Sequence, residues 1–226
     1  DHVINFEVTT LFNDGWNPDN PEMYIRISNF QYVVTRGKLL PTVISQDMEL
    51  TSDEFWIIGS PVLVEKGVTL TIQPGTQVQW GAMSGDPYNP GPQSGNLVVR
   101  GTLLAGGTES APINLFPSYL VSGQRVNIQV DGGIADLNYT KVRNPNLTSI
   151  QIIDHCYFDW DAYECVLDTQ VISNSIFHKL WSSSPTARIN ANVFDTCLFD
   201  RSRMGPKINA RLYNCTFLQD NEYVTP

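Results

Sequence analysis

A chain of 226 residues with 42% hydrophobic residues is long enough to bury one large core or two small ones. Its formal net charge of -9 and isoelectric point near 4.7 argue against nucleic acid or an anionic membrane as the main partner. No apolar run approaches the roughly 18 residues that a membrane span needs, and the first residues lack the pattern of an export signal. The abundance of β-branched and aromatic residues, with Gly and Pro throughout, predicts an all-β protein.

The first part of the chain, residues 1–55, lacks the repeat found further on. Residues 3–12 and 23–35 alternate between apolar and polar side chains, and residues 13–22 form a polar connection rich in Pro, Asn and Asp. This pattern indicates two strands joined by a loop. Because the end of a solenoid exposes apolar groups, we expect this segment to cap the first coil. The alternatives are an interaction module with an exchanged strand, or an independent small domain.

The middle of the chain contains two similar phrases. Residues 61–80 match residues 95–116, with Gly67 falling on Gly101, and residues 81–95 are the excess that we expect to bulge out as a loop. Just before them, residues 51–59 begin like a capped helix but end in Trp-Ile-Ile-Gly, which favours a short strand equally well.

The last third of the chain repeats one short phrase in the fragments IIDHCYF, VISNSIF, VFDTCLF and RLYNCTF. The fragments end at Phe158, Phe177, Phe199 and Phe217, at intervals of 19, 22 and 18 residues. Each has an apolar pair, then a polar residue, then an alternating piece with Cys or Ser two places before the Phe. The polar residues are His155, Asn174, Thr196 and Asn214. Alternation of period two indicates strands with one buried face.

A strand–corner–strand phrase repeated about every twenty residues predicts a coil stacked into a solenoid. Successive coils would pair as parallel strands about 4.8 Å apart, so that equivalent residues form ladders of Phe, of Cys or Ser, and of Asn-type corner residues. We count roughly seven coils over residues 61–226. The predicted fold is an all-β, right-handed parallel β-helix over residues 56–226 with an N-terminal β cap over residues 1–55.

The middle phrases resemble the opening coils of secreted right-handed parallel β-helix repeat proteins, in the superfamily that includes pectate lyases, phage tailspikes and bacterial adhesins. The matching residues are Val64, Gly67, Leu70, Ile72, Pro74, Gly75 and Val78, then Gly101, Leu103, Ala105, Gly107, Thr108, Pro112 and Ile113. The resemblance covers residues 61–226 and implies a secreted or cell-surface β-helix. It leaves the function open, because that group spans lyases, hydrolases, adhesins and junction proteins.

The cysteines allow three states. Cys156, Cys197 and Cys215 share the ladder position two residues before Phe, where buried thiols would pack as small apolar groups. The alternatives are a disulfide between Cys197 and Cys215 on adjacent coils, or one between Cys156 and Cys165 that staples a single loop. The absence of any CxxC pair argues against a zinc site.

Two sequons, at Asn138 and Asn146, lie in a region that we expect to be a polar loop, where they would carry glycans in a eukaryotic secretory pathway. A third sequon begins at Asn214, which a corner ladder explains better.

The segment FDWDAYE offers the most concentrated set of functional side chains. Asp159, Asp161 and Glu164 are candidate calcium ligands, because calcium prefers carboxylate oxygens. Trp160 and Tyr163 beside them are candidate sugar-stacking residues. Calcium is the one cofactor that the sequence suggests, and an ordinary solvated turn is the alternative.

A second set follows from the repeat. Asp159, His178 and Asp200 each come directly after a ladder Phe, so we expect them to stack along one edge with Arg201 beside them. Catalysis by Asp159, Asp161, His178, Asp200 and Arg201 would need paired acid and base groups, as in glycoside hydrolysis. Asp and His are also ordinary turn residues at such positions.

The resulting expectation is a non-catalytic extracellular or cell-surface module with a structural, adhesive or glycan-binding role. The expected partners are a glycan or another cell-surface protein, with homo-oligomers or filaments formed by coils that stack end to end. The alternative is a polysaccharide lyase or glycosidase at the predicted edge. A third reading is a receptor-binding fragment of a trimeric phage spike.

Overall fold

The structure is a computed structural model that describes residues 2–12, 23–34, 37–81, 95–118, 125–159, 166–178, 188–200 and 208–218. All regular structure in these residues is β-strand. The chain divides into two compact units, residues 1–36 and residues 37–226. Each unit is described by itself.

The first unit is a β-hairpin. Strands β1 (His2–Phe12) and β2 (Met23–Val34) pair antiparallel from His2 opposite Val34 to Phe12 opposite Met23, with one irregularity between Phe6 and Val8. Both strands expected from the alternating pattern are therefore present. The role of this unit as a cap stays a prediction.

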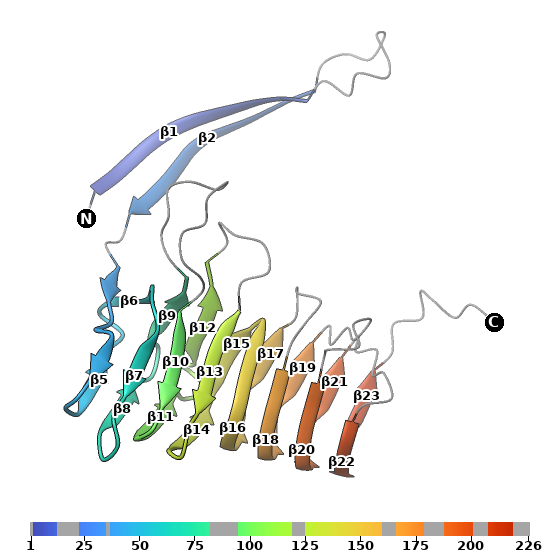
Figure 1. The fold of residues 1–226 in the computed structure, drawn as a ribbon. Coiled ribbons are helices and arrows are strands. Elements are labelled where there is room, and N and C mark those ends of the chain that lie inside the picture. Colours follow the sequence, from blue (N-terminus) through green and yellow to red (C-terminus); the bar gives the residue numbers. More distant parts are fainter. Residues whose placement is uncertain are drawn as a thin grey trace. The chain divides into compact units, whose positions relative to one another are not determined.

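The second unit is a parallel β-helix in which two sheets enclose one core (Figure 1). The nine-stranded sheet contains β3 (Lys38–Leu39), β6 (Phe55–Ile58), β9 (Gln77–Trp80), β12 (Ile113–Pro117), β15 (Thr140–Arg143), β17 (Tyr157–Asp159), β19 (Ile176–His178), β21 (Leu198–Asp200) and β23 (Thr216–Leu218). Each strand pairs parallel with the equivalent strand of the next turn.

The twelve-stranded sheet runs alongside in the same order of turns (Figure 1). It contains β4 (Val43–Ile44), β5 (Met48–Leu50), β7 (Val62–Val64), β8 (Thr69–Ile72), β10 (Asn96–Val99), β11 (Thr102–Gly106), β13 (Val126–Val130), β14 (Ile134–Asn138), β16 (Pro145–Asp154), β18 (Val166–Ser173), β20 (Arg188–Asp195) and β22 (Ile208–Tyr213). In the early turns two short strands occupy this sheet, and from β16 onward one long strand replaces them.

The β-helix begins earlier than expected. Strands β3, β4 and β5 already pair parallel with β6, β7 and β8, so the expected boundary at residues 55 and 56 lies within the described coils. In the first turn Lys38 takes the ladder position, and its Nζ lies 4.7 Å from the ring centroid of Trp56. Residues 51–59, which were compatible with a capped helix or a short strand, contain strand β6 and no helix. After residue 61, where roughly seven coils were expected, the nine-stranded sheet contains β9, β12, β15, β17, β19, β21 and β23.

Strand alternation puts the core between the sheets. Along β8, Leu70 and Ile72 are buried while Thr69 and Thr71 are partly exposed, as a half-buried strand requires. The two middle phrases form successive turns, as expected, but not at the constant interval that puts Gly67 on Gly101. Val62 pairs with Leu97 and Thr69 with Thr102, so the register shifts between the two strands of the turn.

Glycine permits the sharp bends of the early turns. Gly67 has a φ of 80°, and a Cβ on Gly101 would collide with the carbonyl oxygens of Val68 and Glu65. In the first long strand the equivalent irregularity is Ser149, which has a φ of 61°.

The expected phenylalanine ladder is present. The rings of Phe158 and Phe177 stack at 5.2 Å between centroids, those of Phe177 and Phe199 at 4.8 Å, and those of Phe199 and Phe217 at 4.7 Å. Phe194, from the opposite sheet, meets Phe177 and Phe199 edge-on. Stacked and edge-on contacts are the favoured aromatic geometries, so the ladder stabilises the last turns.

The expected corner ladder is present between the two sheets. Tyr139, His155, Asn174, Thr196 and Asn214 all have φ between 45° and 54°. This left-handed conformation turns the chain within one or two residues from the twelve-stranded to the nine-stranded sheet. Asn tolerates it best among residues with a side chain, which explains the residue type at two of the corners.

Candidate functional site

The predicted edge residues lie in one row. Arg143, Asp159, His178, Asp200 and Leu218 occupy equivalent positions at the ends of β15, β17, β19, β21 and β23. His178 Nδ1 lies 2.8 Å from Asp200 Oδ2. The ring of Tyr157 stacks against that of His178, with 6.1 Å between centroids. The carboxylate and the phenol ring together fix the orientation of the His178 imidazole.

Two carboxylates, those of Asp159 and Asp200, lie at this edge on either side of His178, with Arg143 in register beside Asp159. Burial raises the pKa of Tyr157, and the nearby carboxylates of Asp159 and Asp200 raise it further. Asp159 Oδ1 is buried and has no hydrogen-bond partner within the described residues. A carboxylate next to an oriented imidazole can exchange protons with a bound molecule, so this row is a candidate acid–base site.

The remaining predicted site residues lie outside the described residues. These are Trp160, Asp161, Tyr163, Glu164, Cys165 and Arg201. The sugar-stacking pair therefore stays a prediction, and so does calcium binding by Asp159, Asp161 and Glu164. In the described part of the chain no group of His, Cys, Asp or Glu is arranged to hold a metal ion.

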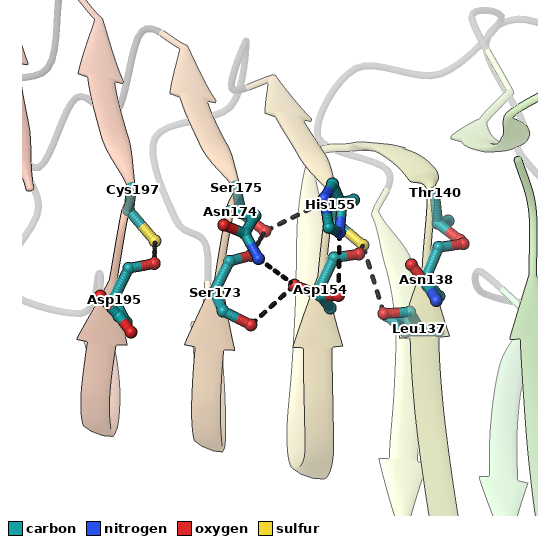
Figure 2. Close-up of polar contacts among 11 residues, drawn as sticks. Leu137, Asn138, Thr140, Asp154, His155, Ser173, Asn174, Ser175, Asp195 and Cys197 are labelled. Atoms are coloured by element: carbon teal, nitrogen blue, oxygen red, sulfur yellow. Dashed lines mark hydrogen bonds and ion pairs between the residues drawn. The ribbon is translucent and has the colours of Figure 1, made fainter. Parts of the chain in front are cut away.

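The three described cysteines are free thiols, so the alternative disulfide between Cys197 and Cys215 is not formed, whereas the pairing of Cys156 with Cys165 involves a residue outside the described ones. The Cys156 thiol donates to the carbonyl oxygens of Leu137 and Asp154, at 3.5 Å and 3.3 Å, and the Cys156 N–H donates to Ser175 Oγ. Beside these bonds the side chains of Ser173 and Asn174 donate to Asp154 Oδ1 (Figure 2). Burial raises the pKa of Cys156 to about 12 and that of Cys197 to about 11. These thiols therefore stay protonated and serve packing rather than nucleophilic chemistry.

A polar groove runs across the early turns. It has a volume of about 680 Å³, within the range of ligand sites in proteins. The described lining residues are Pro61, Asn96, Asn127, Ile128, Gln129, Val130, Asn146, Thr148 and Ser149. None of these carries a charge, in contrast to the edge row.

Three asparagines form a ladder in this groove. Asn96 pairs in register with Asn127, and Asn127 with Asn146, on the outer face of β10, β13 and β16. The Asn146 side chain donates from Nδ2 to Asn127 Oδ1 at 2.7 Å. Beneath the ladder Trp80 Nε1 donates to the Asn127 carbonyl oxygen at 3.1 Å. Because this bond uses Asn146 Nδ2 as donor and Asn127 Oδ1 as acceptor, the Asn127 side-chain N–H groups can donate to other partners and the Asn146 side-chain oxygen can accept from them.

The two expected glycosylation residues lie in strands instead of the expected loop. Asn138 ends β14 and is exposed, so its modification stays a prediction. Asn146 lies within β16 and uses its side-chain nitrogen for the bond to Asn127. A glycan on Asn146 would project from the groove itself.

Sequence reasoning missed the groove residues. Asn96, Asn127 and Asn146 come at unequal intervals, because the chain from β10 to β13 is longer than the chain from β13 to β16. Aligning the buried residues that directly follow them, Leu97, Ile128 and Leu147, would have revealed the ladder.

Comparisons with protein-family models, with curated proteins and with solved structures find no match for this chain. Within the described residues no helix is long and apolar enough to cross a membrane. The structure alone establishes a parallel β-helix with an uncharged, amide-lined groove and an edge row that contains Asp159, His178 and Asp200.

Proposed function

We propose that this chain is a non-catalytic extracellular β-helix module that binds a glycan, in a structural or adhesive role, through the amide-lined groove. The observation that carries the proposal is the asparagine ladder in a groove of about 680 Å³. Amides both donate and accept hydrogen bonds, which suits the hydroxyl groups of a sugar. The ladder repeats at the rung spacing of about 4.8 Å, so an extended chain with repeating hydroxyls meets equivalent groups along it.

The glycan that fits is neutral. The described lining offers no Arg or Lys to pair with a carboxylate or sulfate group. The chain also carries a formal net charge of -9, which repels polyanions. Binding is therefore expected to depend little on salt, in contrast to the recognition of an acidic polysaccharide.

The test compares binding of neutral and acidic oligosaccharides by calorimetry. The double variant Asn127→Ala/Asn146→Ala should bind the neutral ligand roughly tenfold more weakly, because each hydrogen bond contributes about 0.5–1.5 kcal/mol. Asn192→Ala, at an exposed position of β20 away from the groove, is the matched control and should bind normally. Equal affinities of the groove variant and the control would contradict the groove assignment.

A second candidate function is glycoside hydrolysis or lyase activity at the edge row. It is favoured by the 2.8 Å contact between His178 and Asp200 and by Asp159 one strand away. The glycan-binding proposal predicts no release of reducing ends or unsaturated sugars from any polysaccharide. Turnover that is lost in His178→Ala and Asp200→Asn, and retained in the groove variant, would favour the enzyme instead.

The setting outside the cell is supported by the acidic charge and by the sequence resemblance, and fractionation of producing cells tests it. Assembly end to end also stays a proposal, supported by Phe217 and Leu218, which are about half exposed at the last described turn. Lys38 over Trp56 places a charge at the first turn, so stacking on that end would have to bury an ammonium group. The phage-spike reading predicts a trimer in light scattering.

A further inference from the structure

One outward row of the twelve-stranded sheet exposes apolar side chains to solvent. The part of this row here called the apolar stripe consists of Leu104, Asp136, Ile152, Val171, Val193 and Arg211 on β11, β14, β16, β18, β20 and β22, and beyond Leu104 the row continues through Thr71 to Glu49 on β8 and β5. Leu104 is 40% exposed, Ile152 48% and Val171 39%. Neighbouring rungs of a sheet are about 4.8 Å apart, so these side chains form one continuous line.

A carboxylate interrupts the stripe between two apolar residues. Asp136 lies in register between Leu104 and Ile152, and its Oδ1 is buried without a hydrogen-bond partner in the described part of the chain. Burial also raises the pKa of Asp136, as expected for a carboxylate shielded from water. A buried polar atom without a partner is costly, so a cationic group that meets Asp136 would be favoured.

The same row supplies such a group at its other end. From Asp136 the stripe passes through Ile152, Val171 and Val193 to the exposed Arg211, with Val171 at the centre. Asp136 and Arg211 are four rungs apart, or roughly 19 Å, which is too far for contact within one chain.

A second copy turned by 180° about an axis through Val171, parallel to the strands, would reverse the order of the rungs. Val171 would then face Val171, and Ile152 would face Val193 of the second copy. Asp136 would face Arg211 of the second copy, and this pair would occur twice because such an interface is self-complementary.

We propose that the apolar stripe is the contact surface of an antiparallel homodimer in which Asp136 of each copy pairs with Arg211 of the other. This surface is distinct from the groove and from the edge row, so the inference goes beyond the proposed function. The occupant is a second copy because the stretch of the stripe from Asp136 to Arg211 complements itself in both charge and apolar residues.

The adjacent outward row weakens this contact. Asp154 and Asp195 lie two residues beyond Ile152 and Val193, so in the dimer they would face each other across the axis. Hydrogen bonds from each copy's own corner residues, including Asn174 to Asp154 and Asn214 to Asp195, hold these carboxylates along the rung direction. The narrow stripe and this repulsion favour a dimer that forms only at high protein concentration.

The test measures molar mass by light scattering across protein concentration, with sedimentation to separate monomer from dimer. The wild-type chain should approach twice the monomer mass as concentration rises. Asp136→Arg and Arg211→Asp should each remain monomeric because like charges then meet, whereas the combined swap Asp136→Arg/Arg211→Asp should restore the dimer. Glu109→Arg, a charge reversal at an exposed turn outside the stripe, should leave the dimer unchanged.

Circular dichroism checks that every variant is folded, and Val171→Asp provides a second disruption at the centre of the stripe. A monomer at every concentration would overturn the proposal. An oligomer that persists in Val171→Asp and in both single charge variants would also overturn it and would indicate contact through the coil ends. Glycan binding by the monomeric variants should match the wild type, so this test and the groove test can fail separately.

Discussion

Replacement of Phe177 by Ala tests whether the phenylalanine ladder stabilises the β-helix as its geometry indicates. Phe177 is fully buried and contacts three aromatic rings, stacked against Phe158 and Phe199 and edge-on to Phe194. Truncation of a buried Phe to Ala costs about 3–5 kcal/mol through lost burial and the cavity that remains. The lost aromatic contacts put the expected cost at about 4 kcal/mol or above.

Phe217 provides the comparison within the same ladder. It is 49% exposed, and among the described residues it stacks against Phe199 alone, at 4.7 Å. Its replacement by Ala should therefore cost about 1–2 kcal/mol, since only part of its surface is buried and no enclosed cavity forms.

Urea denaturation followed by circular dichroism measures both variants. With a slope of about 2–3 kcal/mol/M, the Phe177→Ala midpoint should fall by more than about 1 M and the Phe217→Ala midpoint by less than about 1 M. An unchanged slope keeps the comparison valid. Equal losses in the two variants, or a loss below about 1 kcal/mol for Phe177→Ala, would refute the assignment of the ladder as the core of the last turns.

Three further results are expected. Burial raises the pKa of Asp154, but hydrogen bonds from Ser173, Asn174 and His155 lower it more, so the folded pKa lies below the unfolded value of about 3.9. The ionised carboxylate therefore stabilises the fold above about pH 3.9, and this stabilisation is lost as the pH falls through the folded pKa. The difference in urea midpoint between the wild type and Asp154→Asn should accordingly close below that pH. Thr196 is a β-branched residue with a φ of 54°, so Thr196→Asn should raise the free energy of unfolding by about 0.5–1 kcal/mol, and a lower value would count against corner strain. In a Cys165→Ser background a maleimide should label Cys215, partly exposed at the last described turn, faster than Cys156 and Cys197; equal rates would contradict the burial argument.

The later turns could be predicted from sequence because one chemical solution recurs there. Each coil needs a residue that tolerates the left-handed region, then a small inward residue, then a ring, and Asn174, Ser175 and Phe177 supply these in one short phrase. Parallel register follows from stacking such phrases. The phrase therefore encodes both the local turn and its partner in the next coil.

The first turns could not be predicted in this way because their inward positions are filled differently. Leu40, Ile44 and Leu50 are buried in the first coil, but no polar corner or ladder Phe accompanies them. Trp56 takes the ladder position in the next coil. Since any large apolar residue can fill an inward position, the coil from β3 to β5 has no repeat to recognise.

Among the candidate sites, too, one could be predicted from the sequence and the others could not. The edge row was predictable because Asp159, His178 and Asp200 directly follow ladder residues, so that their register is that of the Phe ladder. The groove and the apolar stripe depend on outward residues, which the core does not constrain. Only the observed register brings Asp136 and Arg211 into one row.

The two kinds of connection between the sheets give the molecule two unequal sides for evolutionary change. The turn from the twelve-stranded to the nine-stranded sheet is one or two residues long from β14 onward, and its backbone conformation and hydrogen bonds leave no room for insertions. The return connection ranges from the single residue Asn144 to the stretch between β9 and β10, without a change in the register of the flanking strands. From β14 onward new sequence can therefore accumulate on the return side alone, beside the edge row, while the opposite corner preserves the spacing of the coils.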